Sequence, residues 1–172
     1  MRTIQKLDFQ VDKDNRKIHV TREFASNVAN VWAAWTKAEL LDQWWAPHPW
    51  QAKTKKMDFR EGGMWLYAMV GPEGENIWAR LDYVRINALK SFNSKDAFCN
   101  ENGVINESFP RMLWNNVFKD QGDATTVAVE ISFSELADLE KIIEMGFKEG
   151  FTAALENLDE LIGQLSLGNG HW

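Results

Sequence analysis

The chain has 172 residues, of which 45% are hydrophobic and 26% are charged, so its composition is that of one globular domain with a substantial core. Its formal net charge of −6 argues against binding to nucleic acid, which needs a basic face. The same charge argues against binding to an anionic membrane surface.

The N-terminal segment is polar and lacks the apolar stretch of a signal peptide, so we predict that residues 1–16 are loosely ordered. No apolar run approaches the ~20 residues that span a bilayer. Cys99 is the single cysteine and cannot form an internal disulfide, which fits a reducing compartment. We therefore expect a cytoplasmic protein with one domain over residues 17–166 and a short tail over 167–172.

The first part of this domain is predicted to be a strand followed by two short helices. Residues 17–24, KIHVTREF, alternate in the manner of a half-buried strand. Apolar residues at helical spacing then predict a helix over 28–35 and a second one ending before Pro47. Thr36 and Glu39 have the spacing of a capping box that would begin the second helix.

The middle of the chain is a series of strand patterns separated by tight turns. Short turns make neighbouring strands antiparallel, so one antiparallel sheet is expected. The predicted strands cover 50–59, 64–70, 76–86, 90–99, 112–119 and 125–133.

The C-terminal stretch 135–165 has apolar residues at the i, i+3, i+4, i+7 spacing of one helical face. Its opposite face is charged, so the apolar stripe must lie on another apolar surface. The sheet can supply that surface, and the element order therefore indicates an α+β fold.

Gly146 and Gly150 both fall on the apolar stripe, one turn apart. One interpretation is that Gly146 separates a short helix from a long one, because a straight helix over the whole stretch would run ~45 Å at ~1.5 Å per residue. The other interpretation is that the missing side chains leave room for a ligand beneath Phe147 and Phe151.

This order of elements, with these residues, resembles the START-like superfamily, also called SRPBCC or Bet v 1-like, and within it the Hsp90-ATPase-activator-homologue (AHSA1-like) family. The resemblance implies a helix-grip fold, in which a curved antiparallel sheet of about six or seven strands, with two short helices, grips one long C-terminal helix around a cavity. The segments that carry the resemblance are VWAAWT at 31–36, LLDQWWAP at 40–47, MDFREGGMW at 57–65, FCNENG at 98–103 and GFKEGF at 146–151.

If such a cavity exists, the side chains that face the helix would line it. The alternative is that the same side chains simply fill the core. The candidate ligand-binding residues are Trp65, Tyr67, Met69, Phe147, Phe151 and Leu155, with Trp44 and Trp114 near an entrance.

No catalytic signature is present, and His19, His48 and His171 are far apart in the chain, so no metal or cofactor is expected. Of the three, only His48, between two prolines, is near the expected pocket mouth. Four charged residues have two interpretations: Asp58, Arg60, Arg80 and Asp82. They could form a paired polar group inside the cavity, or they could form salt bridges on the outer face of the sheet. The apolar residues at the alternate positions favour the outer face.

We therefore expect the chain to bind a small hydrophobic or aromatic molecule rather than to catalyse a reaction. A cyclase- or hydrolase-like enzyme using polar groups in the cavity is the alternative. A co-chaperone-type interaction module is the third possibility that the resemblance implies, although co-chaperones of this family carry an additional N-terminal domain. A homodimer is compatible with the sequence.

Overall fold

In the computed structural model, which describes residues 7–167, eight antiparallel strands form one sheet in the order β1-β2-β8-β7-β6-β5-β4-β3. The strands are β1 (Asp8–Asp12), β2 (Lys17–Phe24), β3 (Gln51–Met57), β4 (Met64–Val70), β5 (Asn76–Asn87), β6 (Ser91–Phe98), β7 (Leu113–Asp120) and β8 (Thr125–Ser132). The helices are α1 (Val28–Thr36), α2 (Ala38–Trp44), α3 (Leu136–Glu144) and α4 (Phe147–Leu167).

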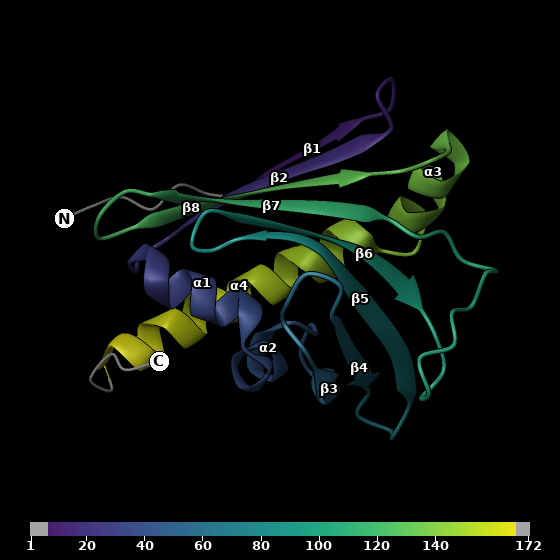
Figure 1. Cartoon of the computed structure of the whole chain (residues 1–172), viewed down its shortest axis with the longest axis horizontal. Helices are drawn as coiled ribbons and strands as arrows, with labels where there is room; N and C mark the ends of the chain where they lie inside the picture. The colour runs from purple at the N-terminus through teal and green to yellow at the C-terminus, as the bar shows by residue number, and fades with distance from the viewer. Residues whose placement is uncertain (1–6, 168–172) are drawn as a thin grey trace.

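The sheet bends over α4, and α1 and α2 lie on the same side of it (Figure 1). The strands alternate between buried and exposed side chains, so one face of the sheet is apolar and the other meets water. The apolar stripe of α4 lies against that buried face, and Leu155, Leu158 and Ile162 are at most 2% exposed. The core therefore lies between the concave face and this helix, which is the helix-grip arrangement implied by the resemblance.

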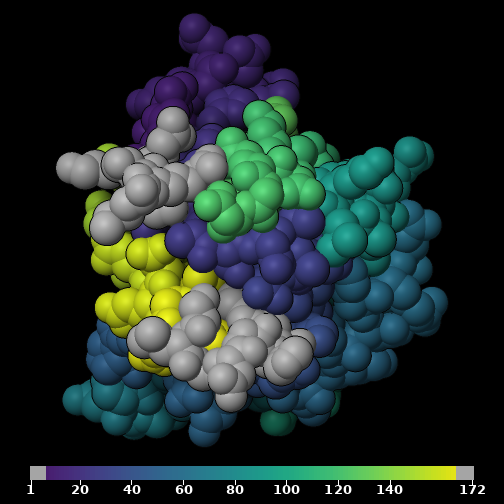
Figure 2. Space-filling view, turned by 90° about the vertical axis from the view of Figure 1, so that its left-hand side faces the viewer, coloured from purple at the N-terminus to yellow at the C-terminus, as the bar shows by residue number. Residues whose placement is uncertain are grey.

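Helices α1 and α2 are fixed to each other and to their surroundings by hydrogen bonds. The Trp44 indole Nε1 donates to the carbonyl of Ala34 at 2.9 Å, and Asn157 Nδ2 on α4 donates to the carbonyl of Ala46 at 3.0 Å. Thr125 Oγ1 donates to the carbonyl of Ser26 at 2.9 Å. Thr125 follows the turn between β7 and β8, and this turn lies above α1 in the view of Figure 2.

The seven strands predicted from alternation are confirmed, with small shifts at their ends, but the strand count is eight. The additional strand is β1, within the segment that we expected to be loosely ordered. It pairs antiparallel with β2, with Phe9 opposite Val20 and Val11 opposite Ile18. As an edge strand with three exposed residues of five, β1 has too weak an apolar alternation to be recognised from sequence. Residues 1–6 lie outside the described part of the chain.

The boundary between α1 and α2 differs from the prediction. Thr36 ends α1, and its Oγ1 donates to the carbonyl of Trp32 at 2.8 Å instead of capping α2. Lys37 stands at the N-cap position of α2. The capping-box prediction was wrong because a threonine in the last turn of one helix can bond back to its own backbone. At the other end, α4 continues through Leu167, where the tail was expected to begin, and residues 168–172 lie outside the described chain.

Of the two interpretations of Gly146, the break between a short helix and a long one is confirmed. This residue has a φ of +88°, in the left-handed region that glycine adopts at little cost, and it separates α3 from α4. The short helix is α3 and the long C-terminal helix is α4. The break lets the chain turn at one end of the sheet before α4 crosses the concave face.

The charged residues of β5 lie on the outer face of the sheet, as the alternation favoured. Asp82 accepts hydrogen bonds from Arg80 Nε at 3.1 Å and from Arg111 at 2.5 Å, while the next residues along β5, Leu81 and Tyr83, are buried on the inner face. Asp58 pairs with Arg60 at 2.7 Å near the surface. These groups therefore form ion pairs away from the core.

The two edges of the sheet are β1 and β3. Strand β3 contains a register shift between Thr54 and Lys56, and it exposes Lys53, Lys55 and Lys56. Within residues 7–167, every helix is too short or too polar to cross a membrane.

Gly146→Ala is expected to destabilise the fold by about 1–2 kcal/mol, because an L side chain is strained at this positive φ. Gly163→Ala in α4 is the matched control. Gly163 is exposed and helical, so its substitution should raise the free energy of unfolding by up to ~1 kcal/mol. Urea denaturation of the two variants tests this difference in sign, and equal effects would contradict the strain at Gly146.

Candidate functional site

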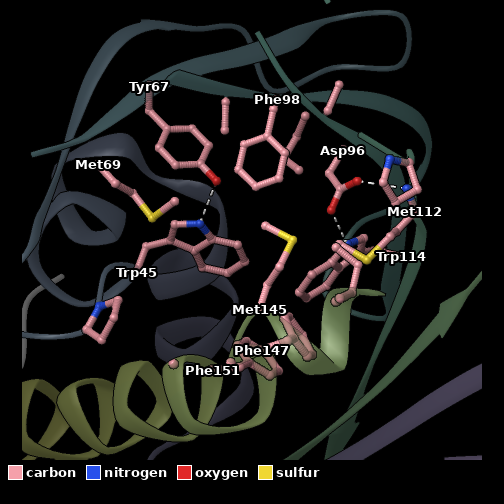
Figure 3. A pocket seen from close by; sticks show the side chains of 18 residues that line it. Trp45, Tyr67, Met69, Asp96, Phe98, Met112, Trp114, Met145, Phe147 and Phe151 are labelled. Atoms are coloured by element: carbon pink, nitrogen blue, oxygen red, sulfur yellow. Dashed lines mark hydrogen bonds between the residues drawn. The ribbon is translucent and has the colours of Figure 1, made fainter. Parts of the chain in front are cut away.

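A cavity of about 270 Å³ lies between the concave face of the sheet and the junction of α3 with α4. Its walls come from the end of α2, from β4, β5, β6 and β7, and from the first turns of α4 (Figure 3). Most of the lining is apolar or aromatic. The residues that line it are Trp45, Pro47, Tyr67, Met69, Ala79, Leu81, Asp96, Ala97, Phe98, Pro110, Met112, Trp114, Ile142, Met145, Gly146, Phe147, Gly150 and Phe151.

The register of β5 and β6 forms the wall opposite the helices. Leu81 pairs with Asp96, and Ala79 pairs with Phe98. Directly paired residues point to the same face of a sheet, so all four side chains belong to the concave side. The small Ala79 leaves space between larger neighbours.

The wall formed by α4 is aromatic beside two glycines. Phe147 and Phe151 stack with ring centroids 5.4 Å apart, and Trp114 meets Phe151 edge-on at 5.4 Å. A Cβ placed on Gly146 or on Gly150 would have no neighbouring atom within 4 Å. The two interpretations of the glycines are therefore compatible, because Gly146 breaks the helix and both glycines border open space.

Trp45 is at the centre of the aromatic contacts and was missed in favour of its neighbour Trp44. Its ring lies within about 6 Å of the rings of Trp65, Trp114 and Phe151. Its Nε1 donates to the Tyr67 hydroxyl oxygen at 2.9 Å. Helical spacing alone does not separate two adjacent tryptophans at a helix end, where Trp45 is the C-cap residue.

Five of the eight residues predicted to bind a ligand line the cavity: Tyr67, Met69, Trp114, Phe147 and Phe151. The other three lie in the surrounding core. Trp44 is fully buried between α1 and α2, and Trp65 is fully buried with its Nε1 on Thr54 and its ring stacked on Tyr67. Leu155 packs two turns further along α4 than Phe147 and is 1% exposed.

Asp96 is the ionisable residue that the sequence reading missed. Its Oδ1 accepts from the backbone N–H of Met112 and its Oδ2 accepts from the Trp114 indole, each at 2.8 Å (Figure 3). Burial raises the pKa of this carboxyl to about 6, although the two hydrogen bonds oppose the shift. Asp96 as a residue is partly exposed, and it borders the cavity.

A signal for Asp96 was present in the sequence. Phe92, Ser94, Asp96 and Phe98 share one side of β6, and Phe92 and Ser94 are buried. An aspartate at the same parity as two phenylalanines therefore faces inward. Tyr67 is the second polar group of the cavity, and burial raises the pKa of its phenol well above the ordinary value.

Neither of the two histidines in the described part of the chain lines this cavity. His48 is exposed and does not line it, His19 lies on β2, and His171 lies outside the described residues. Within residues 7–167, no three of the His, Cys, Asp and Glu side chains come together as metal ligands.

Asp96 is expected to make stability depend on pH. Its folded pKa of about 6 exceeds the ~3.9 of an unfolded aspartate, so the folded state binds this proton more tightly. The free energy of unfolding should therefore fall as pH rises from about 4 to about 7. Relative to Asp96→Asn, the wild type should lose on the order of 2 kcal/mol over this range.

Urea unfolding of the wild type and of Asp96→Asn at both ends of the range measures this effect. Contributions from the other carboxyl groups cancel in the difference between the two proteins. A difference that stays constant with pH would show that Asp96 titrates normally.

Solved structures share this fold over nearly the whole chain. A protein from Arthrobacter aurescens is 25% identical with a TM-score of 0.87, covering 91% of each chain. Protein Ms6760 from Mycobacterium smegmatis is 25% identical with a TM-score of 0.83, covering 92% of this chain and 96% of its own. The AHSA1 protein from Silicibacter pomeroyi has the same fold at 20% identity, with a TM-score of 0.69 over 88% of this chain and 99% of its own. No curated protein matches the sequence.

One protein-family model matches residues 25–163, which include α1, α2, α3, strands β3 to β8 and most of α4. Its description is "Activator of Hsp90 ATPase homolog 1-like protein". The matched range covers every residue that lines the cavity, and it exceeds half of the chain. The family resemblance is thereby confirmed: this chain belongs to the AHSA1 family of START-like proteins.

Proposed function

We propose that this protein binds a small hydrophobic or aromatic molecule in the cavity between the sheet and the start of α4. The observation that carries the proposal is the cavity itself, which stays open within an otherwise close-packed core. Ligand sites are typically concave and mostly apolar, with a few polar groups that fix orientation. This lining has that character, with Asp96 and the Tyr67 hydroxyl as its ionisable groups.

The size of the cavity limits the ligand. Its volume of about 270 Å³ is slightly below the ~300–1,000 Å³ of common small-molecule sites. A molecule with one or two rings suits this space better than a sterol or a diacyl lipid. Flat rings also suit the stacked Phe147 and Phe151 and the edge of Trp114, since aromatic pairs gain from offset and edge-to-face contact.

Catalysis in the cavity is the second candidate, because a carboxyl with a pKa of about 6 can accept a proton near neutral pH. An acid–base enzyme also needs a second ionisable group that converges with the first. Within the described chain, the Asp96 carboxylate bonds to Met112 and Trp114, and the Tyr67 hydroxyl bonds to Trp45. The two ionisable groups are not joined, so binding is the better-supported function.

Contact with a chaperone, which the family description suggests, ranks below ligand binding. The cavity is a concrete feature of this chain, whereas no feature of the described surface points to a protein partner. The free Cys99 is consistent with a cytoplasmic location, which we also propose.

Filling the cavity should weaken ligand binding. Gly150→Leu places a side chain in the open space beside Phe147 and Phe151, and it should weaken binding of a bicyclic probe such as naphthylethanol at least tenfold. Gly163→Leu is the matched control in the same helix, because Gly163 is exposed and lies away from the cavity, and its affinity should equal that of the wild type. Isothermal titration calorimetry measures both affinities.

Circular dichroism and urea unfolding establish that both variants are folded. The proposal fails if the wild type shows no saturable binding of one- and two-ring aromatic probes. It also fails if Gly150→Leu binds naphthylethanol as tightly as Gly163→Leu does.

A further inference from the structure

The carboxylate of Asp96 faces the cavity with only part of its hydrogen-bonding capacity used. Oδ1 accepts one bond from the Met112 backbone and Oδ2 accepts one from the Trp114 indole. A carboxylate has about four acceptor sites. The two donors partly stabilise the negative charge of Asp96. Because both donors are neutral, neither of them is a counterion.

The positive charge of Arg111 lowers the pKa of Asp96 slightly against the effect of burial, but the hydrogen bonds of Arg111 are directed elsewhere. Its Nε donates to the main-chain carbonyl of Asp96 at 2.9 Å, and its Nη2 donates to Asp82 Oδ2 at 2.5 Å. Asp82 also pairs with Arg80, so Arg111 belongs to the ion-pair network on the outer face of the sheet. Within residues 7–167, no lysine or arginine forms an ion pair with the Asp96 carboxylate.

The groups that face Asp96 across the cavity are also uncharged. The lining contributed by α3, the α3–α4 junction and α4 consists of Ile142, Met145, Phe147, Phe151 and two glycines. Strand β4 contributes Tyr67, which is neutral because burial raises the pKa of its phenol. Asp96 is therefore the one anionic centre among the described residues of this cavity.

A cationic ligand would remove an energetic cost that a neutral ligand would leave in place. An ionised carboxylate in a largely apolar site is unfavourable without a partner, and removing the remaining water from it makes the cost larger. An ammonium supplies both the opposite charge and strong hydrogen-bond donors. Aromatic side chains also attract cations, so the aromatic lining of the cavity favours the same group.

We propose that this cavity takes an arylalkyl amine, with its one- or two-ring body against Phe147 and Phe151 and its ammonium on Asp96. This inference rests on the proposed function, because it names the chemical class of ligand for the same cavity. Asp96 then determines ligand specificity, and the aromatic wall supplies affinity shared by all flat ligands.

Three matched probes test the inference by isothermal titration calorimetry at about pH 7.5: naphthylethylamine, naphthylethanol and naphthylacetate. They share the ring system and differ at the end group, which is cationic, neutral or anionic. We expect the wild type to bind the amine at least tenfold more tightly than the alcohol and to bind the acetate most weakly.

Asp96→Asn should abolish the preference for the amine while leaving affinity for the alcohol within about threefold. A residue that merely supports the cavity would change the affinities of both probes equally. Asp58→Asn is the matched control: it removes the same charge at a site where Asp58 pairs with the exposed Arg60, and it should keep the preference.

The wild type supplies a second measurement if Asp96→Asn does not fold. With a pKa of about 6, the fraction of ionised Asp96 rises about tenfold between about pH 5 and about pH 7.5. Affinity for the amine, which stays protonated over this range, should rise about tenfold, whereas affinity for the alcohol should change little.

The outcomes separate the two proposals. If the alcohol binds and the amine has no advantage in the wild type, or if Asp96→Asn keeps that advantage, the inference is overturned and the proposed function stands. If none of the three probes binds, both are overturned. An amine preference that depends on Asp96 and rises with pH supports both.

Discussion

The contact between α4 and the concave face of the sheet is the interaction on which the rest of the structure depends. The helix is amphipathic, and its apolar stripe has one available surface, the inner side of strands whose outer side meets water. The contact is uneven along the helix. Leu155, Leu158 and Ile162 are buried to at most 2% exposure, whereas Gly146 and Gly150 leave space before the sheet. Core and cavity are thus two parts of the same interface.

The polar group Asp96 lies within this interface at a cost to stability. A buried carboxyl such as Asp96 lowers stability when it is ionised, and a hydrophobic residue at this place on β6 would pack at lower cost. The surrounding structure instead provides two directed hydrogen bonds, from Met112 and Trp114. Local departures from the rules of stable packing concentrate at functional sites, and this one borders the cavity between the sheet and the start of α4.

Much of the fold could be predicted because it follows from local periodicity. The alternation of seven strands and the helical stripe of α4 are repeated signals, and the outward position of Arg80 and Asp82 follows from the same parity. Features set by tertiary contact were not predictable in this way. Strand β1 owes its existence to pairing with β2, and Thr36 bonds within α1 although its spacing fits a cap for α2.

The candidate site was predictable in outline and not in detail. The family resemblance implied a cavity between the sheet and the C-terminal helix, and the two glycines suggested space beneath Phe147 and Phe151. A cavity lined by both phenylalanines lies there. Whether Trp44 or Trp45 faces it depends on how α2 ends and on the bond of Asn157 to Ala46, which sequence spacing does not encode. Asp96 could have been found from its parity with Phe92 and Phe98, but its hydrogen bond to Trp114 depends on the pairing of β6 with β7.

The lysine-rich edge strand β3 has a consequence for self-association. An open sheet edge offers unpaired backbone groups on which a second chain can add a strand, and proteins block this with charge and with bulges. Strand β3 has both, since Lys53, Lys55 and Lys56 are exposed around a register shift. Two copies that met along this edge would set like charges against each other across an irregular ladder. The β3 edge of the sheet is thereby protected against edge-to-edge polymerisation. A homodimer would therefore be favoured on another surface of the protein.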